Sequence, residues 1–316
     1  MIERGGEMWT LIAGGFMGWA LGANDAANLI GPAVESRALR FWTAAVIASG
    51  FVVLGAVMVG SRGFATYGAI GTQTLVSSFI VMLSAGITVA GMTFLGLPVS
   101  GTQAVVGAII GAGLVSGGVN VAPLIKIFVS WVLTPLGGLV AAYIPYKLIT
   151  LYPGHGISRL ATHIRVVRIG LVLVTAYAAY SYGANNVANV TGVYVKAGLL
   201  SPLPAAIIGA ATIALGILTF SRNVIRTVGS RLVALDPFAA LVVVLGESIT
   251  LNIYALLGVP VSASQAVVGA VVGIGLVKGA RTINARALVR ILFGWLGTPT
   301  IAAGLSLGLT LLIRAI

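Results

Sequence analysis

The sequence contains no cysteine and very little charge, and both absences narrow what the protein can be. Without cysteine, disulfide bonds, thiol catalysis and cysteine-ligated metals are excluded. Only 8% of the residues are charged and 59% are apolar, whereas soluble domains carry about 25% charged residues. A chain of 316 residues cannot cover a water-facing surface with so few charges. The composition therefore predicts an integral membrane protein.

Histidine is also scarce, and the basic residues are scattered. The two histidines, His155 and His163, lie in one polar segment, so a histidine-rich metal site is not expected. A net charge of +12 could suit a nucleic acid, but Lys and Arg stand singly and form no patch interleaved with aromatic residues. They fit better as markers of the cytoplasmic side of a membrane. The stretch from Met1 to Trp9 lacks the basic region and cleavage site of a signal peptide.

Apolar segments long enough to cross about 30 Å of hydrocarbon recur along the chain. Two of them open with Leu97-Pro98 and Val259-Pro260, and a helix break is expected there because proline disfavours helix on its N-terminal side. These two segments could also be hairpins that re-enter the membrane. The ten expected segments cover residues 9–31, 41–60, 70–93, 97–118, 121–145, 165–192, 203–220, 232–257, 260–279 and 284–313.

The basic residues are distributed unevenly between the two sides of such a membrane protein. If each segment crosses once, 13 of the 18 Lys and Arg residues fall on one side. The positive-inside rule makes that side cytoplasmic and places both termini outside the cell. A polar segment over residues 147–164 then becomes a cytoplasmic linker. We expect a multi-pass protein of the plasma membrane.

Three stretches of the first half recur in the same order in the second half. The segments Pro98–Gly117 and Pro260–Gly279 are identical at 14 of 20 aligned positions. Collinear matches of this kind indicate an internal duplication. The other two matches pair GANDAAN at Gly22–Asn28 with GANNVAN at Gly183–Asn189, and Trp131–Pro135 with Trp295–Pro299.

The duplication predicts the fold class. Residues 1–146 form the first repeat and residues 165–316 the second, joined by the linker over 147–164. Each repeat holds five segments, and because five is odd, the second repeat enters the membrane upside down. The prediction is an all-α integral membrane protein of two inverted-topology repeats, with broken or hairpin helices at the pseudo-two-fold axis. Many secondary transporters have this architecture, with their substrate sites near the bilayer midplane.

Amide and carboxyl side chains inside the apolar segments mark a candidate cation site. Such groups are costly in lipid unless they are paired. Asp25 lies sixteen residues beyond Trp9 and apolar residues resume after it, which places it at membrane depth. Its oxygens and those of asparagine suit a hard cation; the alternative is a protonated Asp that packs between helices. The predicted cation-binding residues are Asn24, Asp25, Asn28, Asn185, Asn186, Asn189 and Glu247.

The other acidic residues have more local interpretations. Glu247 lies in an apolar stretch and could be a cation ligand, a proton carrier, the partner of a basic residue, or an interfacial Glu. Its repeat partner is Ala85, so it has no symmetric mate. Asp236 precedes Pro237 and is expected to cap a helix start. Glu35 is expected to form an ion pair with nearby Arg37 in a loop.

Hydroxyl and amide residues that follow the proline breaks mark a candidate anion site. A helix that starts there points free N–H groups and the positive end of its dipole at a ligand. Two such starts, one from each repeat, could hold a tetrahedral oxyanion from opposite sides. The alternative is that these small residues only permit close helix packing. The predicted substrate-binding residues are Ser100, Gly101, Thr102, Gln103, Ser262, Ala263, Ser264 and Gln265.

At these residues the sequence resembles the inorganic phosphate transporter family, whose members couple phosphate to sodium or protons. The resemblance rests on the two Asn motifs and the two Pro-Val-Ser segments, and it covers nearly the whole chain. It implies an inverted-repeat fold with hairpin helices, phosphate between the hairpins and cations at the Asn motifs. A sodium site would then include Asn24, Asp25 and Asn185. Family members are commonly dimeric, so a homodimer is a further expectation.

The sequence departs from the family pattern in two places. The second Asn-Asp motif of the family is Asn185-Asn186 here, so one negative charge is missing, which Glu247 could replace. The family's Pro-Ser-Thr-Thr-His pattern ends in Gln103 and Gln265, which removes a group that titrates near pH 7. The sequence therefore leaves open whether the substrate is phosphate or sulfate, and whether the coupling ion is sodium or a proton.

These observations predict a secondary active transporter that moves inorganic phosphate with sodium or a proton by alternating access. No cofactor is expected. Phosphate would share a chamber with Asp25, and a cation is needed to offset the repulsion between them. A sulfate permease of the same fold and an anion channel are the alternatives. An enzyme is not expected, because no Ser-His pair or His-Glu metal set lies at membrane depth.

Overall fold

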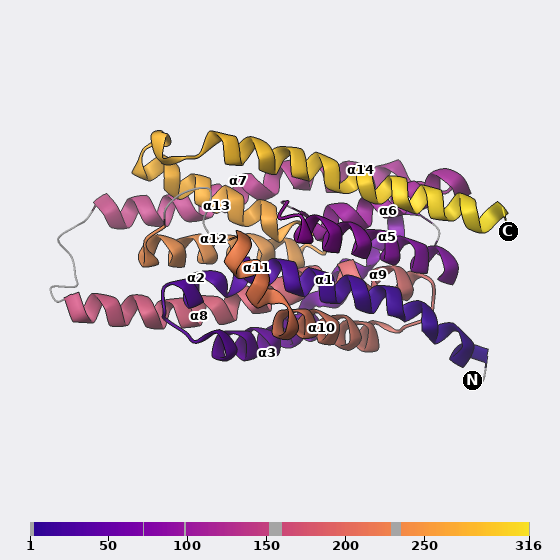
Figure 1. The fold of residues 1–316 in the computed structure, drawn as a ribbon, viewed down its shortest axis with the longest axis horizontal. Helices are drawn as coiled ribbons and strands as arrows, with labels where there is room; N and C mark the ends of the chain where they lie inside the picture. The colour runs from indigo at the N-terminus through magenta and orange to yellow at the C-terminus, as the bar shows by residue number, and fades with distance from the viewer. Residues whose placement is uncertain (1–2, 72, 98, 152–159, 229–234, 316) are drawn as a thin grey trace.

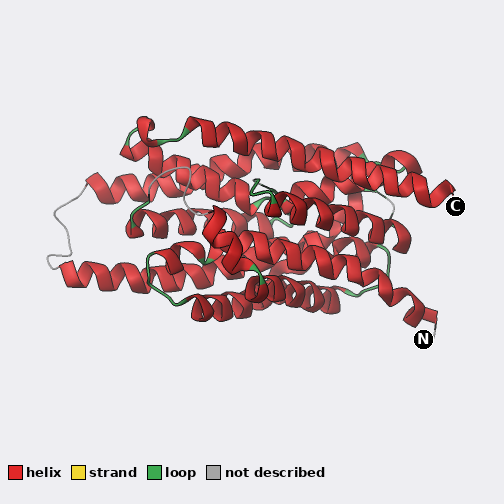
Figure 2. Ribbon diagram, viewed as in Figure 1, coloured by secondary structure: helices red, strands yellow, loops and turns green. Residues whose placement is uncertain are grey.

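The structure is a computed structural model that describes residues 3–71, 73–97, 99–151, 160–228 and 235–315. These residues are almost all helical, and their only β pairing is an isolated bridge between Gly71 and Val119 (Figure 2). Pro98 and His155, on which two of the sequence predictions fall, lie outside the described residues.

The part of the chain predicted to form the first repeat contains the elements from η1 to α7. It comprises η1 (Glu3–Thr10), α1 (Leu11–Leu29), α2 (Gly31–Glu35), α3 (Phe41–Val59), η2 (Gly60–Gly63), α4 (Phe64–Ile70), α5 (Leu75–Phe94), α6 (Gly101–Ser116) and α7 (Val121–Leu151). The second repeat comprises α8 (Leu160–Asn186), α9 (Ala188–Lys196), α10 (Pro202–Thr219), α11 (Ser221–Val228), α12 (Pro237–Leu256), α13 (Ala263–Lys278), η3 (Ala280–Thr282) and α14 (Ala285–Ala315).

Most of the predicted membrane segments coincide with apolar helices, but α1, which lies in the first predicted segment, 9–31, is not among the helices that are long and apolar enough to cross. In the described chain, 7 helical stretches are long and apolar enough to cross a membrane: Phe41–Ile70, Leu75–Phe94, Val121–Leu151, Arg165–Lys196, Pro202–Thr219, Pro237–Leu256 and Ala285–Ala315. Two shorter apolar helices, α6 and α13, are those that follow the predicted proline breaks. Helix α4 lies mostly between two of the expected segments, 41–60 and 70–93. It packs on α9, and its Tyr67 is buried.

The two short helices begin in the same way because the same residues start them. Ser100 and Ser262 are extended N-cap residues with φ of −122° and −85°. Each hydroxyl accepts a hydrogen bond of 3.3 Å, from the backbone amides of Gln103 and Gln265 respectively. A serine cap of this kind satisfies one of the free amides of a helix start and leaves the others available. Asp236 caps α12 by the same rule, as predicted, accepting from the Ala239 amide.

The helices pack in pairs, and each pair combines one helix from each repeat. Helix α1 packs on α10 while its counterpart α8 packs on α3, and α6 packs on α14 while its counterpart α13 packs on α7. Glycines make these approaches possible: a Cβ on Gly22 would collide with the Ile213 carbonyl, and one on Gly183 with the Val52 carbonyl. Both Gly22 to Gly183 and Val52 to Ile213 are steps of 161 positions. The contacts therefore obey a pseudo-two-fold relation.

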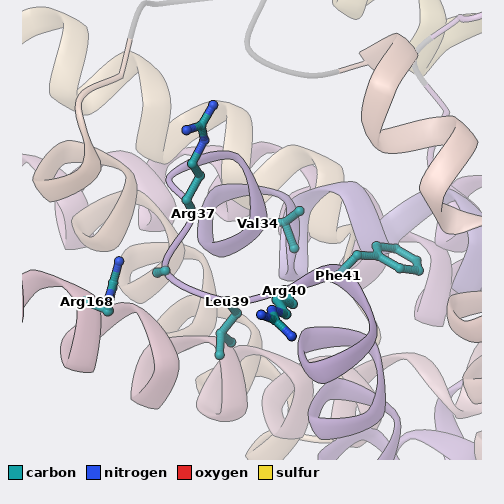
Figure 3. Close-up of a pocket in the computed structure, with 7 residues that line it drawn as sticks. Val34, Arg37, Leu39, Arg40, Phe41 and Arg168 are labelled. Carbon is teal, nitrogen blue, oxygen red and sulfur yellow. The ribbon is translucent and has the colours of Figure 1, made fainter.

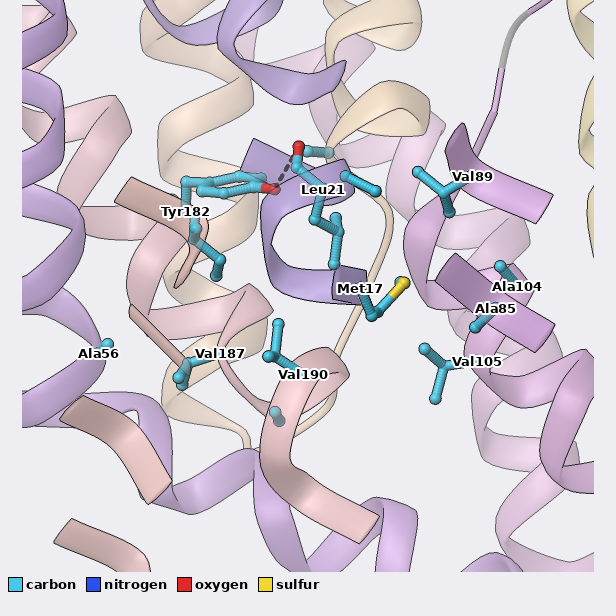
Figure 4. Packing of buried hydrophobic residues seen from close by; sticks show 14 of the residues in the cluster. Met17, Leu21, Ala56, Ala85, Val89, Ala104, Val105, Tyr182, Val187 and Val190 are labelled. Atoms are coloured by element: carbon cyan, nitrogen blue, oxygen red, sulfur yellow. Dashed lines mark hydrogen bonds between the residues drawn. The ribbon is translucent and has the colours of Figure 1, made fainter. Parts of the chain in front are cut away.

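The direction of the helices shows that the relation is an inversion. In Figure 1, α1 and α8 run in opposite directions, and so do α7 and α14. Both termini lie at one end of the molecule, while α7 ends and α8 begins at the other. Small and branched residues fill the centre, where Met17 and Leu21 of α1 lie between Val190 of α9 and Ala85 of α5 (Figure 4). The predicted fold class is confirmed.

Candidate functional site

Asp25 lies inside the helix bundle and not against lipid. Its side chain is 3% exposed on α1, and it accepts hydrogen bonds from Asn24 Nδ2 at 2.8 Å and from the Tyr182 hydroxyl at 2.9 Å. The side-chain oxygen of Asn24, Oδ1, accepts in turn from the Thr93 hydroxyl of α5 at 3.0 Å. Within the described chain the only ion pair joins Lys278 to Asp236, so no basic side chain neutralises Asp25. The hydrogen-bond donors to this carboxyl group are all neutral.

The second Asn motif lies where the long helix of the second repeat breaks between α8 and α9. Asn185 is 2% exposed, and its Oδ1 accepts from the backbone amide of Val261 at 3.0 Å. Its Nδ2 lies 3.4 Å from the carbonyl oxygens of both Leu251 and Val259. Asn185 therefore satisfies backbone groups that the break before α13 leaves unpaired. Its side-chain oxygen, assigned by sequence to sodium, already accepts a hydrogen bond.

Asn189 connects the two repeats at the same level. Its Nδ2 donates to Asn186 Oδ1 at 2.7 Å and to the Thr102 hydroxyl at 3.1 Å, and its Oδ1 accepts from the Tyr67 hydroxyl. Thr102, in the first turn of α6, donates to the Val261 carbonyl at 3.0 Å. The starts of α6 and α13 are thus joined directly, one from each repeat, as the sequence predicted.

The residues at these two helix starts are buried and partly unpaired. Ser100 and Ser262 are 1% and 2% exposed, and the Ser262 and Ser264 hydroxyls lie 2.9 Å apart. Gln103 and Gln265 are buried too, and the Oε1 atom of each has no hydrogen-bond partner in the described chain. Gly101 and Ala263 are the first residues of α6 and α13 and contribute backbone only. Buried polar atoms without partners are costly, which is typical of a site that a ligand completes.

Glu247 of α12 is the second carboxyl in the interior. It is 0% exposed, and neither of its oxygens has a hydrogen-bond partner among the described residues. Asp25 lies within electrostatic range of it. Two buried carboxyl groups near one another cannot both be ionised unless a cation binds beside them; otherwise at least one of them carries a proton. Each repeat contributes one of the two, at positions that are not equivalent.

The remaining predicted residue, Asn28, is half-buried one turn beyond Asp25 and takes no part in these contacts. Three residues of the site were missed by the sequence analysis: Tyr182, Tyr67 and Thr93. A signal existed for Tyr182, which directly precedes the second Asn motif, because a buried tyrosine hydroxyl needs a partner. No group of three or more His, Cys, Asp or Glu side chains that could hold a metal occurs in the described residues. Amide, hydroxyl and carbonyl oxygens would have to complete any cation site.

Comparison with known families places the chain. A model of the phosphate transporter family matches residues 21–166 and again residues 154–306. The chain belongs to the phosphate transporter family. Because each match covers one repeat, the family pattern is itself present twice, in agreement with the duplication. This member of the phosphate transporter family is a multi-pass membrane protein.

Relatives of this family member support the same placement. A provisionally named phosphate permease of Methanocaldococcus jannaschii is 30% identical over 295 residues, which cover 92% of this chain and 93% of the relative. A protein of the same provisional name from Pyrococcus furiosus is 28% identical and covers 95% and 94% of the two chains. A solved structure titled the sodium-dependent phosphate transporter superposes with a TM-score of 0.87 at 25% identity, over 98% of this chain and 99% of the other. The resemblance inferred from the motifs is confirmed.

Proposed function

We propose that this protein is a secondary active transporter that carries inorganic phosphate across the plasma membrane together with a cation. The observation that carries the proposal is the meeting of two capped helix starts, joined from Thr102 to Val261, in a bundle that also buries the carboxyl groups of Asp25 and Glu247 without a basic partner among the described residues. Helix starts attract an oxyanion, and the carboxyl groups attract a cation. An arrangement that binds both in one chamber favours their joint movement.

The phosphate oxygens would bind the first turns of α6 and α13. The backbone amides of those turns and the hydroxyls of Ser100, Thr102, Ser262 and Ser264 supply donors from two sides. The Nε2 groups of Gln103 and Gln265 would add neutral donors, and the Oε1 atoms of both side chains have no partner in the described chain. Because glutamine does not titrate, phosphate recognition at this site would not require protonation of a histidine.

The cation would bind beside Asp25, with Asn24 and Glu247 as further ligands and Asn28, Asn185, Asn186 and Asn189 around them. Like charges about 5 Å apart repel by roughly 3 kcal/mol at an effective dielectric of about 20. A cation between phosphate and Asp25 converts that repulsion into attraction, so transport would be coupled. We favour sodium, since the solved relative is titled a sodium-dependent phosphate transporter. A proton on Glu247 is the other way to meet the same requirement.

The orientation follows from charge. The end at which α7 stops and α8 starts would face the cytoplasm, because most Lys and Arg residues fall on that side. Both termini, which lie at the opposite end, would then be outside the cell. Movement of one helix group against the other would expose the chamber to each side in turn.

Purified protein in liposomes tests the proposal. Labelled phosphate or labelled sulfate is supplied outside, and a sodium gradient and a pH gradient are imposed separately. We expect saturable phosphate uptake that accumulates against its gradient when sodium is higher outside. Accumulation driven only by the pH gradient would identify the proton as the coupling ion. Faster uptake of sulfate than of phosphate would identify sulfate as the substrate. Flux that neither gradient can drive uphill would identify a channel and contradict the proposal.

A further inference from the structure

An open pocket lies away from the residues of the candidate phosphate and cation sites, where α2 turns into α3. Its volume is about 510 Å³, within the range of roughly 300–1,000 Å³ that small-molecule sites occupy. Arg37 and Arg40 from the turn and Arg168 from α8 supply its charged lining. Figure 3 shows Arg168 rising from α8 beside the turn, on the same side as Arg37, with Arg40 farther along it. The two repeats thus both contribute arginine to the pocket.

The positive charge of this pocket is not neutralised by the protein. No acidic residue lines the pocket. Glu35 lies two positions from Arg37, yet the ion pair expected between them is wrong, since the described residues contain only the Lys278–Asp236 pair. That pair is formed farther along, in the neighbouring pocket that Asp236 lines. Three guanidinium groups therefore face a common space without a carboxylate.

Arg37 occupies a strained backbone conformation that topology alone does not require. Its φ is 58°, and it is the only residue other than glycine with a positive φ in the described chain. The equivalent residue of the second repeat, 161 positions later, is Gly198 with a φ of 76°. A charge that served only to orient the protein could stand at Ser36 or Ala38 without strain. Arginine in a position where the repeat uses glycine indicates a role specific to that position.

The other two arginines are also absent from the equivalent turn. Arg40 corresponds to Ser201 and Arg168 to Glu7. The same fold at the other end of the molecule therefore carries no positive charge at these three positions. The arginine cluster therefore occurs at only one end of the molecule, and the equivalent turn at Gly198 forms without it.

The pocket lies at the depth expected of the membrane boundary. Val166 and Ile169, which flank Arg168 on α8, are 50% and 53% exposed, as are residues that face lipid. Trp42, two positions beyond Arg40, is 60% exposed, and tryptophan is enriched at membrane–water interfaces. The neighbouring pocket, which Arg168 also lines, continues over Val167, Leu171 and Phe238 and is lined as well by Asp236, whose carboxylate is paired with Lys278. Arginine side chains beside an apolar surface suit a lipid with a phosphate headgroup.

We propose that Arg37, Arg40 and Arg168 form a second anion-binding site that takes a phosphate group, either the headgroup of an anionic phospholipid or free inorganic phosphate. Guanidinium groups bind phosphate oxygens through paired, charge-assisted hydrogen bonds. The site does not depend on the proposed function, because its residues are separate from the central chamber.

The second repeat supplies a conservative variant to test the site. The double variant R37G/R40S places in the turn the residues that the fold already uses at Gly198 and Ser201, so it is expected to fold. The control R286A/R290S removes two exposed arginines from α14, outside the pocket, and causes the same loss of charge. Size-exclusion chromatography and thermal unfolding in detergent establish that both variants are folded.

Two measurements distinguish the sources of phosphate. Native mass spectrometry of protein from bilayers of equimolar phosphatidylglycerol and phosphatidylcholine counts the retained anionic lipid. Equilibrium binding of labelled phosphate to lipid-depleted protein in neutral detergent counts the free anion. We expect R37G/R40S to weaken one of the two by roughly tenfold or more, since hydrogen bonds to charged groups are strong, while R286A/R290S leaves both unchanged.

Each outcome decides the proposal. Loss of phosphatidylglycerol retention only in R37G/R40S identifies a lipid headgroup site, and loss of a labelled phosphate equivalent only in that variant identifies a free-phosphate site. If R37G/R40S retains lipid and phosphate as the parent does, the proposal is wrong. It is also wrong if R286A/R290S loses as much as R37G/R40S, because the effect would then follow total charge.

Discussion

At the scale of single residues, the two repeats differ most where they carry charge. The equivalent of Asp25 is Asn186, and the equivalent of Glu247 is Ala85. Asn186 keeps a side chain of the same shape, and its Oδ1 accepts from Asn189, which an aspartate could also do. The interior thus holds two carboxyl groups, but the second lies on α12 and not on α8, where a carboxyl symmetric with Asp25 would lie.

Asp25→Asn tests whether one of these carboxyl groups couples the cation to phosphate. Asparagine can still accept the hydrogen bond from Tyr182, so the fold should persist while the charge is lost. We expect sodium-dependent phosphate uptake in liposomes to fall by about 100-fold, as would follow from the loss of roughly 3 kcal/mol of attraction. Asp236→Asn, at the N-cap of α12, is the control and should transport normally. Unchanged uptake with unchanged ion dependence in Asp25→Asn would exclude this role.

Tyr182→Phe tests the donors that hold Asp25. The change removes one of its two hydrogen bonds, and bonds to charged groups contribute about 1.5–3 kcal/mol. We expect the sodium concentration for half-maximal uptake to shift by roughly tenfold with little change in the maximal rate. Tyr194→Phe is the matched control, because its buried hydroxyl bonds to the Thr10 carbonyl outside the chamber. An equal shift in both variants would show a general loss of stability instead.

Residues of the site could be predicted from sequence where the duplication repeats them. Thr102 and Asn189 were predicted and are hydrogen-bonded, and Asp25 is connected to them through Tyr182 and Asn186. The duplication does not mark Tyr67 or Tyr182, because neither has a tyrosine at the equivalent position of the other repeat; only its place before the second Asn motif pointed to Tyr182. Their roles follow from burial and from distances, which depend on how helices remote in sequence pack.

At the scale of helices, the close approaches depend on glycine. Gly22 of α1 lies against the Ile213 carbonyl of α10, and Gly183 of α8 against the Val52 carbonyl of α3. Helix positions and proline breaks could be predicted from hydropathy and from Pro98 and Pro260. The partners of each helix could not, because small residues permit close packing without specifying which helix approaches.

Gly22→Ala should reveal this packing as a loss of stability. An added methyl group must displace backbone, and overpacking of this kind typically costs about 1–3 kcal/mol. Gly183→Ala should have the same effect by the pseudo-two-fold relation. Gly50→Ala is the control: nothing lies within 4 Å of its Cβ position, and alanine stabilises a helix by about 1 kcal/mol relative to glycine. Thermal unfolding in detergent measures all three, and equal midpoints for Gly22→Ala and Gly50→Ala would contradict the packing.

At the scale of the whole molecule, helices of the two repeats pack against each other. One group contains α1, α3, α8 and α10, while α6 packs with α14 and α7 packs with α13 as two further pairs. Helix α5 contacts α1 and the α6–α14 pair, and α12 contacts α8 and the α7–α13 pair. The candidate site lies between the group and these pairs, since Asn189 of α9, which packs beside α10, bonds to Thr102 of α6. A movement of the group against the pairs would break this bond and the one from Val261 to Asn185. Alternation between the two sides of the membrane would therefore require no unfolding of either repeat.

The exchange of partners also predicts how the two repeats depend on each other. A chain that ends after α7 leaves α1 without α10 and α6 without α14, so its close-packing faces have no partner. We expect residues 1–151 and 160–316, expressed separately, to aggregate or be degraded, and to co-purify as a transport-competent pair when expressed together. Gly22→Leu in the first piece should abolish the association, because it obstructs the approach of α10, whereas Gly50→Leu should not. A first piece that remains folded and monodisperse alone would show that each repeat buries its own helices, contrary to the packing described above.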